Sequence, residues 1–441
     1  MGAGGSGMSP LAEVYARRGA HVSGCDLRDS PALRRLETVG VQVYVGHTPD
    51  HLEDAQRVVV SRAVPPTEPE LAAARARGLP VLHRAELLAE LVAGGDSVGV
   101  AGTHGKTTTT ALVSVALEAA GLDPTAVVGG EVRPYGGGAR VGSGPTVAEV
   151  DESDGSLVRV RVHSAVVTGL DLTDHADHYR DLTSLLNTFA QFVAATDPGG
   201  WVVLCADCPN AGRLAPHARG RVVTYGLQSG SYRGRVLEVQ GRWSRFVLQQ
   251  RGREVGEVLL SLPGRHNVLN ATAALAVGLE RGASFEAMRE ALARFGGVRR
   301  RFEVYCDAPL VVDDYAHNPV KVRAFLRAVR EAWPGRRVVA VFQPHRYSRT
   351  RTTYRQYAEA FEDADEVVVT ELYPADEPPE PGVSGRLIAD HLRHPRVRWV
   401  PELEDVVGVL LGCVRPEDVV ATLGAGDVWR VAQRLAQEVK R

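Results

Sequence analysis

The segment 102–110 combines a glycine-rich turn with one lysine and a run of threonines, GTHGKTTTT. It follows an apolar run over 97–101 that predicts a strand, and it opens a helical pattern over 111–120. A phosphate-binding loop needs this order, because glycines let backbone N–H groups face a phosphate and the helix N-terminus favours its charge. The segment therefore predicts a nucleoside triphosphate site, in which Lys106 reaches the β- and γ-phosphates and the Thr107 hydroxyl binds Mg²⁺.

The basic residues of the chain support this interpretation. Lysine occurs only at positions 106, 321 and 440, although the chain has 51 basic residues, so arginine fills nearly every other basic position. Lysine is a compact point charge that suits a tight phosphate loop better than the planar guanidinium fork. The full phosphate-loop pattern has a further glycine where this chain has Val100.

Composition limits the classes of protein that the chain can belong to. Its 441 residues predict about three domains, each able to bury its own core. A net charge of −2 gives no bulk attraction to nucleic acid or to a membrane. No apolar run approaches the roughly 18–20 residues of a membrane span, and no signal peptide is recognised, so we expect a cytoplasmic protein. Of the five cysteines, Cys205 and Cys208 form a lone C-x-x-C that we interpret as core thiols.

The order of strand and helix patterns predicts three α/β units. The sequence Gly-Gly-Asp at 94–96, just before the phosphate loop, predicts a turn at a domain boundary, and a new unit begins near Val298. A β meander is expected over 221–262, followed by a helix over 267–281. We therefore expect domains at 1–95, 96–297 and 298–441.

A second glycine cluster, GAGGSG, occupies 2–7 and fits G-x-G-x-x-G, with acidic Asp26 where a ribose partner would be. Such a loop holds a dinucleotide, as in a nicotinamide-dependent dehydrogenase, or equally the pyrophosphate of a sugar nucleotide. A strand should precede it, but Gly2 follows Met1 directly. We expect that the protein begins upstream, and that this chain has a loosened first domain and weak sugar-nucleotide binding.

Acidic and histidine residues gather at the ends of two predicted strands. Four carboxylates, at 149, 151, 152 and 154, follow the strand 146–150, and the sequence DHADH at 174–178 follows the strand 165–168. Ligands bind at carboxyl ends of strands in open α/β sheets, and Mg²⁺ prefers carboxylate oxygens. We expect the first cluster to hold Mg²⁺ and the second to hold another divalent ion.

Three further motifs complete the candidate site. The sequence HNVLN at 266–270 starts a helix, where asparagine pairs with an adenine edge or caps the helix. The sequences DDYAHNP at 313–319 and FQPHRYSRTR at 342–351 each follow an apolar strand. Arginines in the latter suit bidentate capture of a carboxylate or phosphate.

Taken together, these motifs resemble the Mur ligases, the ATP-dependent amide-forming enzymes of peptidoglycan synthesis, over the full length of the chain. Further landmarks are GVRRRFE at 297–303 and GAGDVW at 424–429. The segment 342–350 is the most diagnostic, and it looks like the alanine-adding members of the family. The resemblance implies a Rossmann-like N-terminal domain, a central mononucleotide-binding ATPase domain and a Rossmann-like C-terminal domain.

The resemblance also implies the roles of individual residues. It assigns catalysis to Lys106, His175, Arg346 and Arg349. It assigns nucleotide binding to Gly102, Thr103, His104, Gly105, Lys106, Thr107, Thr108, Asn270 (adenine), Arg301 (phosphates) and Asp314 (ribose). It assigns substrate binding to Gly4, Gly5, Gly7, Ser9, Asp26, His317, His345, Arg346 and Arg349. It assigns Mg²⁺ binding to Thr107, Glu149 and His175.

The implied reaction joins L-alanine to the carboxylate of UDP-N-acetylmuramate with ATP, through an acyl phosphate. ATP and Mg²⁺ are the expected cofactors, and the expected state is a monomer or weak homodimer without nucleic acid or membrane partners. Two alternatives remain open from the sequence: another ligase of the family, such as a murein tripeptide ligase, or a nicotinamide-dependent dehydrogenase.

Overall fold

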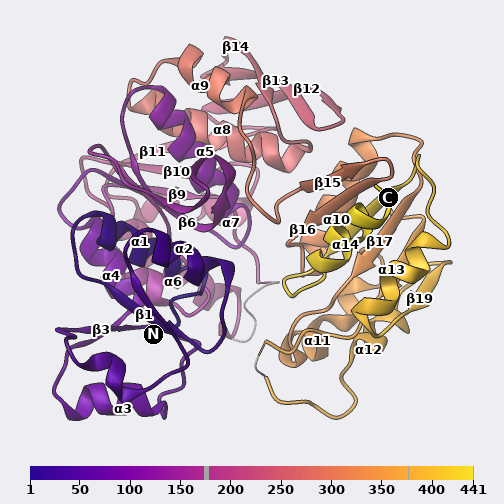
Figure 1. Ribbon diagram of the computed structural model, residues 1–441. Helices are drawn as coiled ribbons and strands as arrows, with labels where there is room; N and C mark the ends of the chain where they lie inside the picture. Colours follow the sequence, from indigo (N-terminus) through magenta and orange to yellow (C-terminus); the bar gives the residue numbers. More distant parts are fainter. Residues whose placement is uncertain (173–177, 376, 441) are drawn as a thin grey trace.

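The computed structural model describes residues 1–172, 178–375 and 377–440. Figure 1 shows three α/β units in chain order: indigo at the N-terminus, magenta to pink in the middle, and orange to yellow at the C-terminus. The C-terminal unit faces the other two across an open side of the molecule. Within the described ranges, no helix is both long and apolar enough to cross a membrane.

The central unit is built on one ten-stranded sheet, in the order β14-β13-β12-β11-β10-β9-β5-β8-β6-β7. Its strands are β5 (Ser97–Ala101), β6 (Thr125–Val132), β7 (Gly137–Arg140), β8 (Thr146–Glu149), β9 (Ser164–Val167), β10 (Trp201–Cys205), β11 (Arg221–Gly226), β12 (Tyr232–Gln240), β13 (Trp243–Gln250) and β14 (Arg253–Leu260). Its α-helices are α5 (Lys106–Ala119), α6 (Leu182–Ala194), α7 (Pro209–Gly212), α8 (Arg265–Glu280) and α9 (Phe285–Ala293).

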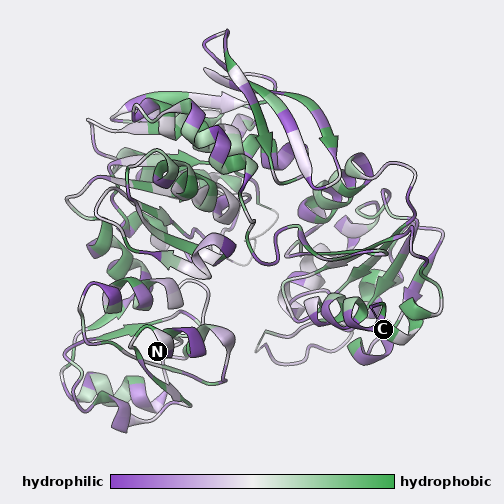
Figure 2. Ribbon diagram, turned by 45° about the horizontal axis from the view of Figure 1, so that its top comes forward, coloured by the Kyte–Doolittle hydropathy of each residue, from purple (hydrophilic) through white to green (hydrophobic). Residues whose placement is uncertain are grey.

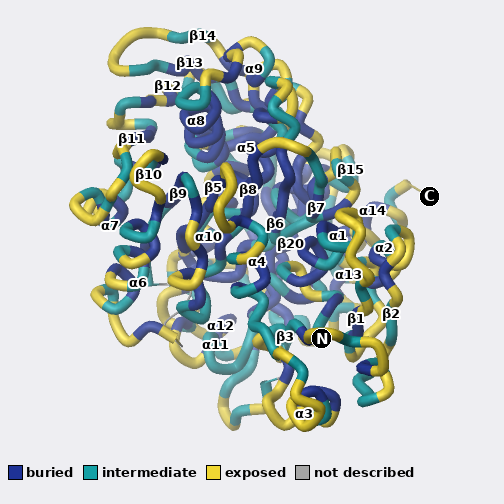
Figure 3. Tube along the Cα trace, turned by 90° about the vertical axis from the view of Figure 1, so that its left-hand side faces the viewer, coloured by how far each residue is buried: buried dark blue, intermediate teal, exposed yellow. Residues whose placement is uncertain are grey.

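Strand β5 lies inside this sheet and every one of its residues is buried. It pairs in parallel with β8 on one side and β9 on the other, so the carboxyl ends of all three strands meet at one edge. Helix α5 packs against α8, and both are dark blue, buried helices in Figure 3. The strand that feeds the phosphate loop is therefore fixed by hydrogen bonds on both sides and by packing.

The N-terminal unit has two separate parallel pairs of strands instead of one sheet: β1 with β2, and β3 with β4. Residues 1–3 lie between the pairs, because the Met1 amine donates to Val59 O at 2.7 Å and Gly2 N donates to Cys25 O at 2.9 Å. The elements are α1 (Ser9–Arg17), β1 (Ser23–Asp26), α2 (Pro31–Thr38), β2 (Gln42–Val45), the 3₁₀ turn η1 (Pro49–Leu52), β3 (Val58–Val60), α3 (Pro69–Ala76), β4 (Val81–His83) and α4 (Arg84–Val92).

The C-terminal unit has a six-stranded sheet in the order β15-β16-β20-β17-β18-β19. Its strands are β15 (Glu303–Asp307), β16 (Leu310–Asp314), β17 (Val338–Phe342), β18 (Glu366–Val369), β19 (Val397–Trp399) and β20 (Val419–Leu423), and its helices are α10 (Pro319–Ala332), α11 (Tyr347–Thr353), α12 (Gly385–Ala389), α13 (Leu403–Leu411) and α14 (Trp429–Glu438). Separate apolar clusters cover its two faces. Figure 2 shows the hydrophobic colour concentrated along its strands.

The sequence predictions agree with these elements at most positions. Strand β5 has the predicted ends. Of the meander predicted over 221–262, β12 to β14 form an antiparallel meander, whereas the prediction is wrong for β11, which pairs in parallel with both β10 and β12. The helix predicted over 111–120 begins earlier, at Lys106, because the threonines after the loop are already helical. The α/β fold class is confirmed, and the domain limits at 95 and 297 stay predictions.

Candidate active site

The phosphate loop joins β5 to α5, and two of its glycines are required by geometry. Gly102 and Gly105 have φ values of 138° and 74°, which side chains rarely adopt. A Cβ at Gly105 would lie 2.5 Å from Asn270 Oδ1, and one at Gly102 would lie 2.2 Å from Thr168 Oγ1. Both glycines therefore allow a turn that is closely packed against its neighbours.

A loop that follows β9 holds the phosphate loop from the side. Thr103 N donates to Gly169 O at 2.9 Å, and Asp171 N donates to Thr103 Oγ1 at 3.1 Å. The Nε2 atom of His104 pairs with the carboxylate of Asp171. Thr103 and His104 thus anchor the loop to the end of the neighbouring strand.

Lys106 forms a buried ion pair beside the loop. Its Nζ donates to Gly102 O at 2.6 Å and to Glu152 Oε1 at 2.8 Å, and the Glu152 side chain is 0% exposed. Burial lowers the pKa of Lys106, but Glu152, Asp151 and Glu149 outweigh that effect and hold the pKa above its ordinary value. Lys106 therefore carries a fixed positive charge at the helix start.

Thr107 and Glu149 bring two oxygen ligands together at the adjacent ends of β5 and β8. Thr107 Oγ1 donates to Glu149 Oε1 at 3.0 Å, and Glu149 Oε2 accepts from Gly129 N at 2.7 Å. Arg301, from the C-terminal unit, donates to Thr107 Oγ1 at 3.4 Å. A hydroxyl and a carboxylate are hard oxygen ligands of the kind that Mg²⁺ prefers.

The remaining carboxylates of the acidic cluster reach the N-terminal unit. Asp151 Oδ2 accepts from Arg84 Nη2 at 3.1 Å, and Asp154 Oδ2 lies 3.3 Å from His83 Nε2. Burial raises the pKa of Asp154, but hydrogen bonds from His83 and Ser156 hold it well below its usual range. The cluster therefore has two tasks: Glu149 and Glu152 serve the phosphate loop, whereas Asp151 and Asp154 bind the first unit.

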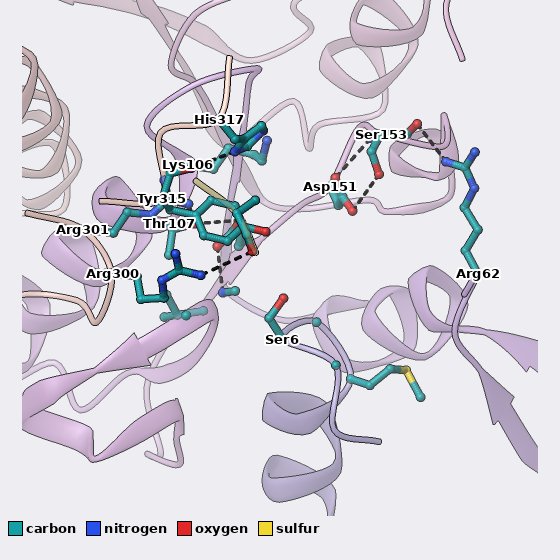
Figure 4. A pocket seen from close by; sticks show the side chains of 18 of the residues that line it. Ser6, Arg62, Lys106, Thr107, Asp151, Ser153, Arg300, Arg301, Tyr315 and His317 are labelled. Carbon is teal, nitrogen blue, oxygen red and sulfur yellow. Dashed lines mark hydrogen bonds between the residues drawn. The ribbon is translucent and has the colours of Figure 1, made fainter. Parts of the chain in front are cut away.

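These elements surround a cavity of about 730 Å³ to which all three units contribute. Figure 4 shows Lys106, Thr107, Arg300 and Arg301 on one side of the cavity and Arg62 on the other, where its guanidinium points to Ser153; Ser6 lies between the two sides. Its described lining contains nine lysines and arginines but four carboxylates; the cations are Arg62, Arg84, Lys106, Arg299, Arg300, Arg301, Lys321, Arg346 and Arg349. This excess of positive charge suits anionic ligands.

The cavity brings together most of the residues that the sequence predicts. Thirteen of them line it: Gly5, Gly7, Thr103, His104, Gly105, Lys106, Thr107, Glu149, Arg301, His317, His345, Arg346 and Arg349. The predicted ligand His175 lies outside the described residues. The other predicted residues, Gly4, Ser9, Asp26, Gly102, Thr108, Asn270 and Asp314, lie behind the lining.

Several of those residues support the wall by hydrogen bonds. Asp26 Oδ2 accepts from Gly4 N at 2.9 Å, so the acidic residue is turned toward the glycine loop. Asn270 Oδ1 accepts from Thr109 Oγ1 at 3.2 Å, next to the phosphate loop. The Asp314 carboxylate accepts from the backbone N–H groups of Phe302 and Ala316. Their roles toward uridine, adenine and ribose stay predictions.

The C-terminal unit holds the residues of the motif 342–351 in place by ring stacking and hydrogen bonds. His345 stacks on Tyr373 with ring centroids 5.7 Å apart, and Arg349 Nη1 lies 3.3 Å from His345 Nδ1. Arg346 precedes α11 with a φ of 70°, and its N–H donates to Tyr373 O at 2.8 Å. His345 and both arginines thus line the cavity from one rigid turn.

The sequence analysis missed part of the lining. Arg62 and Arg84 follow the ends of β3 and β4, and Gly129 and Gly130 interrupt β6 where Glu149 and Thr107 approach. The available signal for the latter was a glycine pair directly after the apolar run Ala126-Val127-Val128. Lys321 lines the cavity from α10, so two of the three lysines in the chain lie at one site.

Comparisons with known proteins agree along the whole chain. Three family models match: "Mur ligase family, catalytic domain" at 1–95, "Mur ligase middle domain" at 100–278 and "Mur ligase, glutamate ligase domain" at 300–426. The UDP-N-acetylmuramate–L-alanine ligase of Rubrobacter xylanophilus is 48% identical, over 99% of this chain and 98% of that protein. The enzyme of the same name from Kineococcus radiotolerans is also 48% identical, over 98% of this chain and 93% of its own.

Solved structures show the same architecture. The UDP-N-acetylmuramate–alanine ligase of Thermotoga maritima is 30% identical and superposes with a TM-score of 0.86, over 100% of this chain and 98% of that one. A MurF ligase from the same organism, solved in complex with ADP, shares the fold at 17% identity and a TM-score of 0.67, over 98% of this chain and 99% of that one. The chain belongs to the Mur ligase family.

Proposed function

We propose that the chain joins L-alanine to the carboxylate of UDP-N-acetylmuramate with conversion of ATP to ADP and phosphate, in the synthesis of peptidoglycan precursors. One observation carries the proposal: a single cationic cavity unites a phosphate loop, a glycine cluster and an arginine-rich turn from three units. The two relatives that are 48% identical over nearly the full chain are both named UDP-N-acetylmuramate–L-alanine ligase. We place the enzyme in the cytoplasm and propose a monomer or weak homodimer.

The residues at the phosphate loop fit ATP and Mg²⁺. Glycine at 102 and 105 leaves backbone N–H groups without side chains in the way, and helix α5 begins directly behind them. Lys106 offers a positive charge at its tip, and Thr107 with Glu149 offers two oxygen ligands 3.0 Å apart. ATP would supply the phosphoryl group that activates a carboxylate, and Mg²⁺ would neutralise charge on its phosphates.

The protein groups then have distinct tasks in the proposed reaction. A carboxylate is a poor electrophile, so it must first become an acyl phosphate before an amine can displace phosphate. Lys106 and Arg301 would counter the negative charge that develops during phosphoryl transfer. His345, Arg346 and Arg349 would orient the amino acid and the muramoyl carboxylate, which is a contribution of positioning. His175, which lies outside the described residues, stays the predicted ligand of a second Mg²⁺.

The glycine cluster of the N-terminal unit would hold the pyrophosphate of the sugar nucleotide. Gly5 and Gly7 line the cavity together with Arg62 and Arg84. A Cβ at Gly7 would lie 2.7 Å from Arg84 Nη1, so the arginine head lies directly over the loop. The alternative of a nicotinamide-dependent dehydrogenase leaves the phosphate loop with Lys106 without a task.

The test measures phosphate release from ATP and Mg²⁺ with each acceptor alone and in combination. We expect turnover only with UDP-N-acetylmuramate and L-alanine together. A murein tripeptide replacing L-alanine tests the sister ligase, and NAD⁺ with the sugar nucleotide tests the dehydrogenase. The proposal would be overturned if phosphate were released from ATP without any amino acid, or if the tripeptide supported turnover and L-alanine did not.

Glu149→Gln provides a matched test of the metal role. Replacing the carboxylate by an amide keeps its size, so the hydrogen bond from Gly129 N is kept while the charge is lost. We expect the Mg²⁺ concentration at half-maximal rate to rise at least ~10-fold, because carboxylate charge contributes to cation affinity. Glu90→Gln, on the exposed face of α4, is the control. An unchanged Mg²⁺ requirement would remove Glu149 from the metal site.

A further inference from the structure

A compact group of metal-ligating side chains lies in the N-terminal unit, away from the cavity. Cys25 Sγ lies 3.2 Å from His47 Nδ1 and 3.3 Å from Glu70 Oε2. His47 Nδ1 lies 3.1 Å from Glu70 Oε2, and His51 Nδ1 lies 3.6 Å from the same oxygen. The ligand atoms of Cys25, His51 and Glu70 all lie within 4.8 Å of one another.

The four side chains come from four different segments. Cys25 is on β1, His47 follows β2, His51 is in the turn η1 and Glu70 is on α3. They are withdrawn from solvent: the side chains of His47 and Glu70 are 4% and 3% exposed, and that of His51 is 11% exposed. None of the four lines the cavity of the proposed active site.

The separations match a tetrahedral metal site. With zinc bond lengths of about 2.3 Å to sulfur and 2.0–2.2 Å to nitrogen or oxygen, adjacent ligand atoms should be roughly 3.3–3.6 Å apart. Four of the six separations in this set are 3.1–3.6 Å, within or slightly below that range, and the Cys25–His51 separation is under 4.8 Å. The ligand types, one thiol, two imidazoles and one carboxylate, are the set that zinc selects.

Charge balance also favours a divalent cation. A thiolate and a carboxylate carry two negative charges, which one divalent ion neutralises while both imidazoles stay neutral. A bound metal would deprotonate the thiol outright.

We propose that Cys25, His47, His51 and Glu70 form a structural zinc site that joins the two halves of the N-terminal unit. Cys25 and His47 belong to the half with β1 and β2, whereas Glu70 is on the helix between β3 and β4. In the described chain these pairs belong to separate sheets, and residues 1–3 join them through backbone hydrogen bonds to Val59 O and Cys25 O. A zinc ion would add a side-chain connection between the same two halves. Four protein ligands leave no position for a substrate, which is typical of a structural site.

The stacking around His51 supports a fixed ligand position. The His51 ring is stacked on Tyr44, with centroids 4.0 Å apart and an interplanar angle of 14°. Leu52 and Leu71, the residues next to His51 and Glu70 in the chain, are buried in an apolar cluster that also contains Cys25 on β1 and Val58 on β3. The ligands therefore lie in a packed, low-dielectric setting, which strengthens their interaction with a cation.

The test uses the full chain stripped of metal and kept in excess Mg²⁺, which fills the carboxylate sites at the phosphate loop. We expect Co²⁺ to bind with one equivalent per chain, with a thiolate-to-cobalt charge-transfer band and the strong visible bands of tetrahedral Co²⁺. Zn²⁺ should displace it and raise the melting temperature. Absence of the charge-transfer band in the unaltered chain would overturn the proposal and leave a hydrogen-bonded cluster.

Matched variants assign the ligands. Cys25→Ser should remove the charge-transfer band, and His51→Asn or Glu70→Gln should weaken Zn²⁺ by more than the roughly 10- to 100-fold cost of losing an outer hydrogen-bond partner. Cys413→Ser and His391→Asn, at the half-buried Cys413 and the exposed His391, should bind as the unaltered chain does. Retention of the band in Cys25→Ser would contradict the assignment.

A second measurement needs no variant and decides the question if a variant fails to fold. Alkylation of each cysteine is followed by peptide mass mapping with and without Zn²⁺, in urea just below the unfolding midpoint of the metal-free chain, where local opening exposes the buried Cys25. We expect Zn²⁺ to slow modification of Cys25 at least ~10-fold, because a coordinated thiolate is no longer available, while Cys413 reacts at an unchanged rate. Equal rates for Cys25 in both conditions would reject the site.

Discussion

The edge of the central sheet and the N-terminal unit hold their polar groups in different ways. At the central edge, Lys106, Thr107 and Glu149 follow the ends of β5 and β8, which are paired in parallel inside a ten-stranded sheet. In the N-terminal unit the strands form two separate pairs, and side chains such as Cys25 and Glu70 bridge them. Hydrogen bonds within one continuous sheet set the first geometry, whereas in the second the two strand pairs are joined by residues 1–3 and by side-chain contacts.

This difference indicates where each region is vulnerable. A substitution at the central edge should remove a chemical group from a scaffold that survives, because β5 and its neighbours are fully buried. A substitution in the N-terminal unit should loosen the scaffold itself and lower sugar-nucleotide binding. Variants can be chosen to separate the two outcomes.

The largest effect should come from Lys106→Met. Loss of the charge beside the transferring phosphoryl group should lower kcat by at least ~10³-fold. The same change leaves Glu152 buried without its cation, which should lower the free energy of unfolding by about 3 kcal/mol. Steady-state kinetics and chemical denaturation measure the two effects separately.

The double variant Lys106→Met/Glu152→Gln tests whether these effects are independent. Removing the buried charge should recover most of the lost stability but none of the activity. Recovery of turnover in the double variant would mean that Lys106 acts only by holding Glu152. Near-normal turnover in the single variant would contradict the phosphate-loop assignment.

A smaller effect is expected from Arg349→Lys at the C-terminal edge. A guanidinium contacts a carboxylate through two parallel N–H groups, and an ammonium cannot reproduce that geometry. We expect kcat/KM to fall about 10- to 100-fold, equivalent to roughly 1.4–2.8 kcal/mol. Arg393→Lys, at a side chain that is 77% exposed, is the matched control and should change little. If kcat/KM falls equally little in both variants, Arg349 does not contact the substrate and is only a surface charge.

The sequence was sufficient to predict the site where its residues form a contiguous motif at the end of one strand. The glycine loop at 102–105, the acidic cluster at 149–154 and the arginine turn at 346–349 are contiguous motifs, and all three reach one cavity. Parallel strands bring their carboxyl ends to the same edge, so order along the chain predicts proximity there. The Mur family resemblance rested on those same segments.

The sequence was not sufficient where contacts join distant segments. His47 and His51 have the H-x₃-H spacing of a zinc-binding pair, but Cys25 and Glu70 lie about 20 residues away on either side and complete no known signature, so only the folded chain brings the four together. The split among the four carboxylates was equally hidden, because the partners of Asp151 and Asp154 lie about 70 residues away on another unit. Long-range side-chain pairing leaves no local pattern.

The smallest expected effect concerns the contact between Arg84 and Asp151. This pair joins the N-terminal unit to the central one at 3.1 Å, with side chains that are 16% and 35% exposed. Because Arg84 also covers the glycine loop at Gly7, Arg84→Ala should weaken UDP-N-acetylmuramate binding about 10-fold, and Asp151→Asn about 3-fold. Calorimetric titration measures each.

A double-mutant cycle then isolates the pair. If Asp151 acts by positioning Arg84, the double variant should lose no more than Arg84→Ala alone, which gives a coupling energy of about 0.6 kcal/mol. The exposed pair Arg57–Glu90, within the N-terminal unit, should show coupling near zero in the same assay. Additive losses at 84 and 151 would show that the two units bind the sugar nucleotide independently. In that case side-chain contacts such as Arg84–Asp151 would stabilise the N-terminal unit without changing its affinity for UDP-N-acetylmuramate. The two regions would then differ in how they are stabilised and not in how they bind ligands.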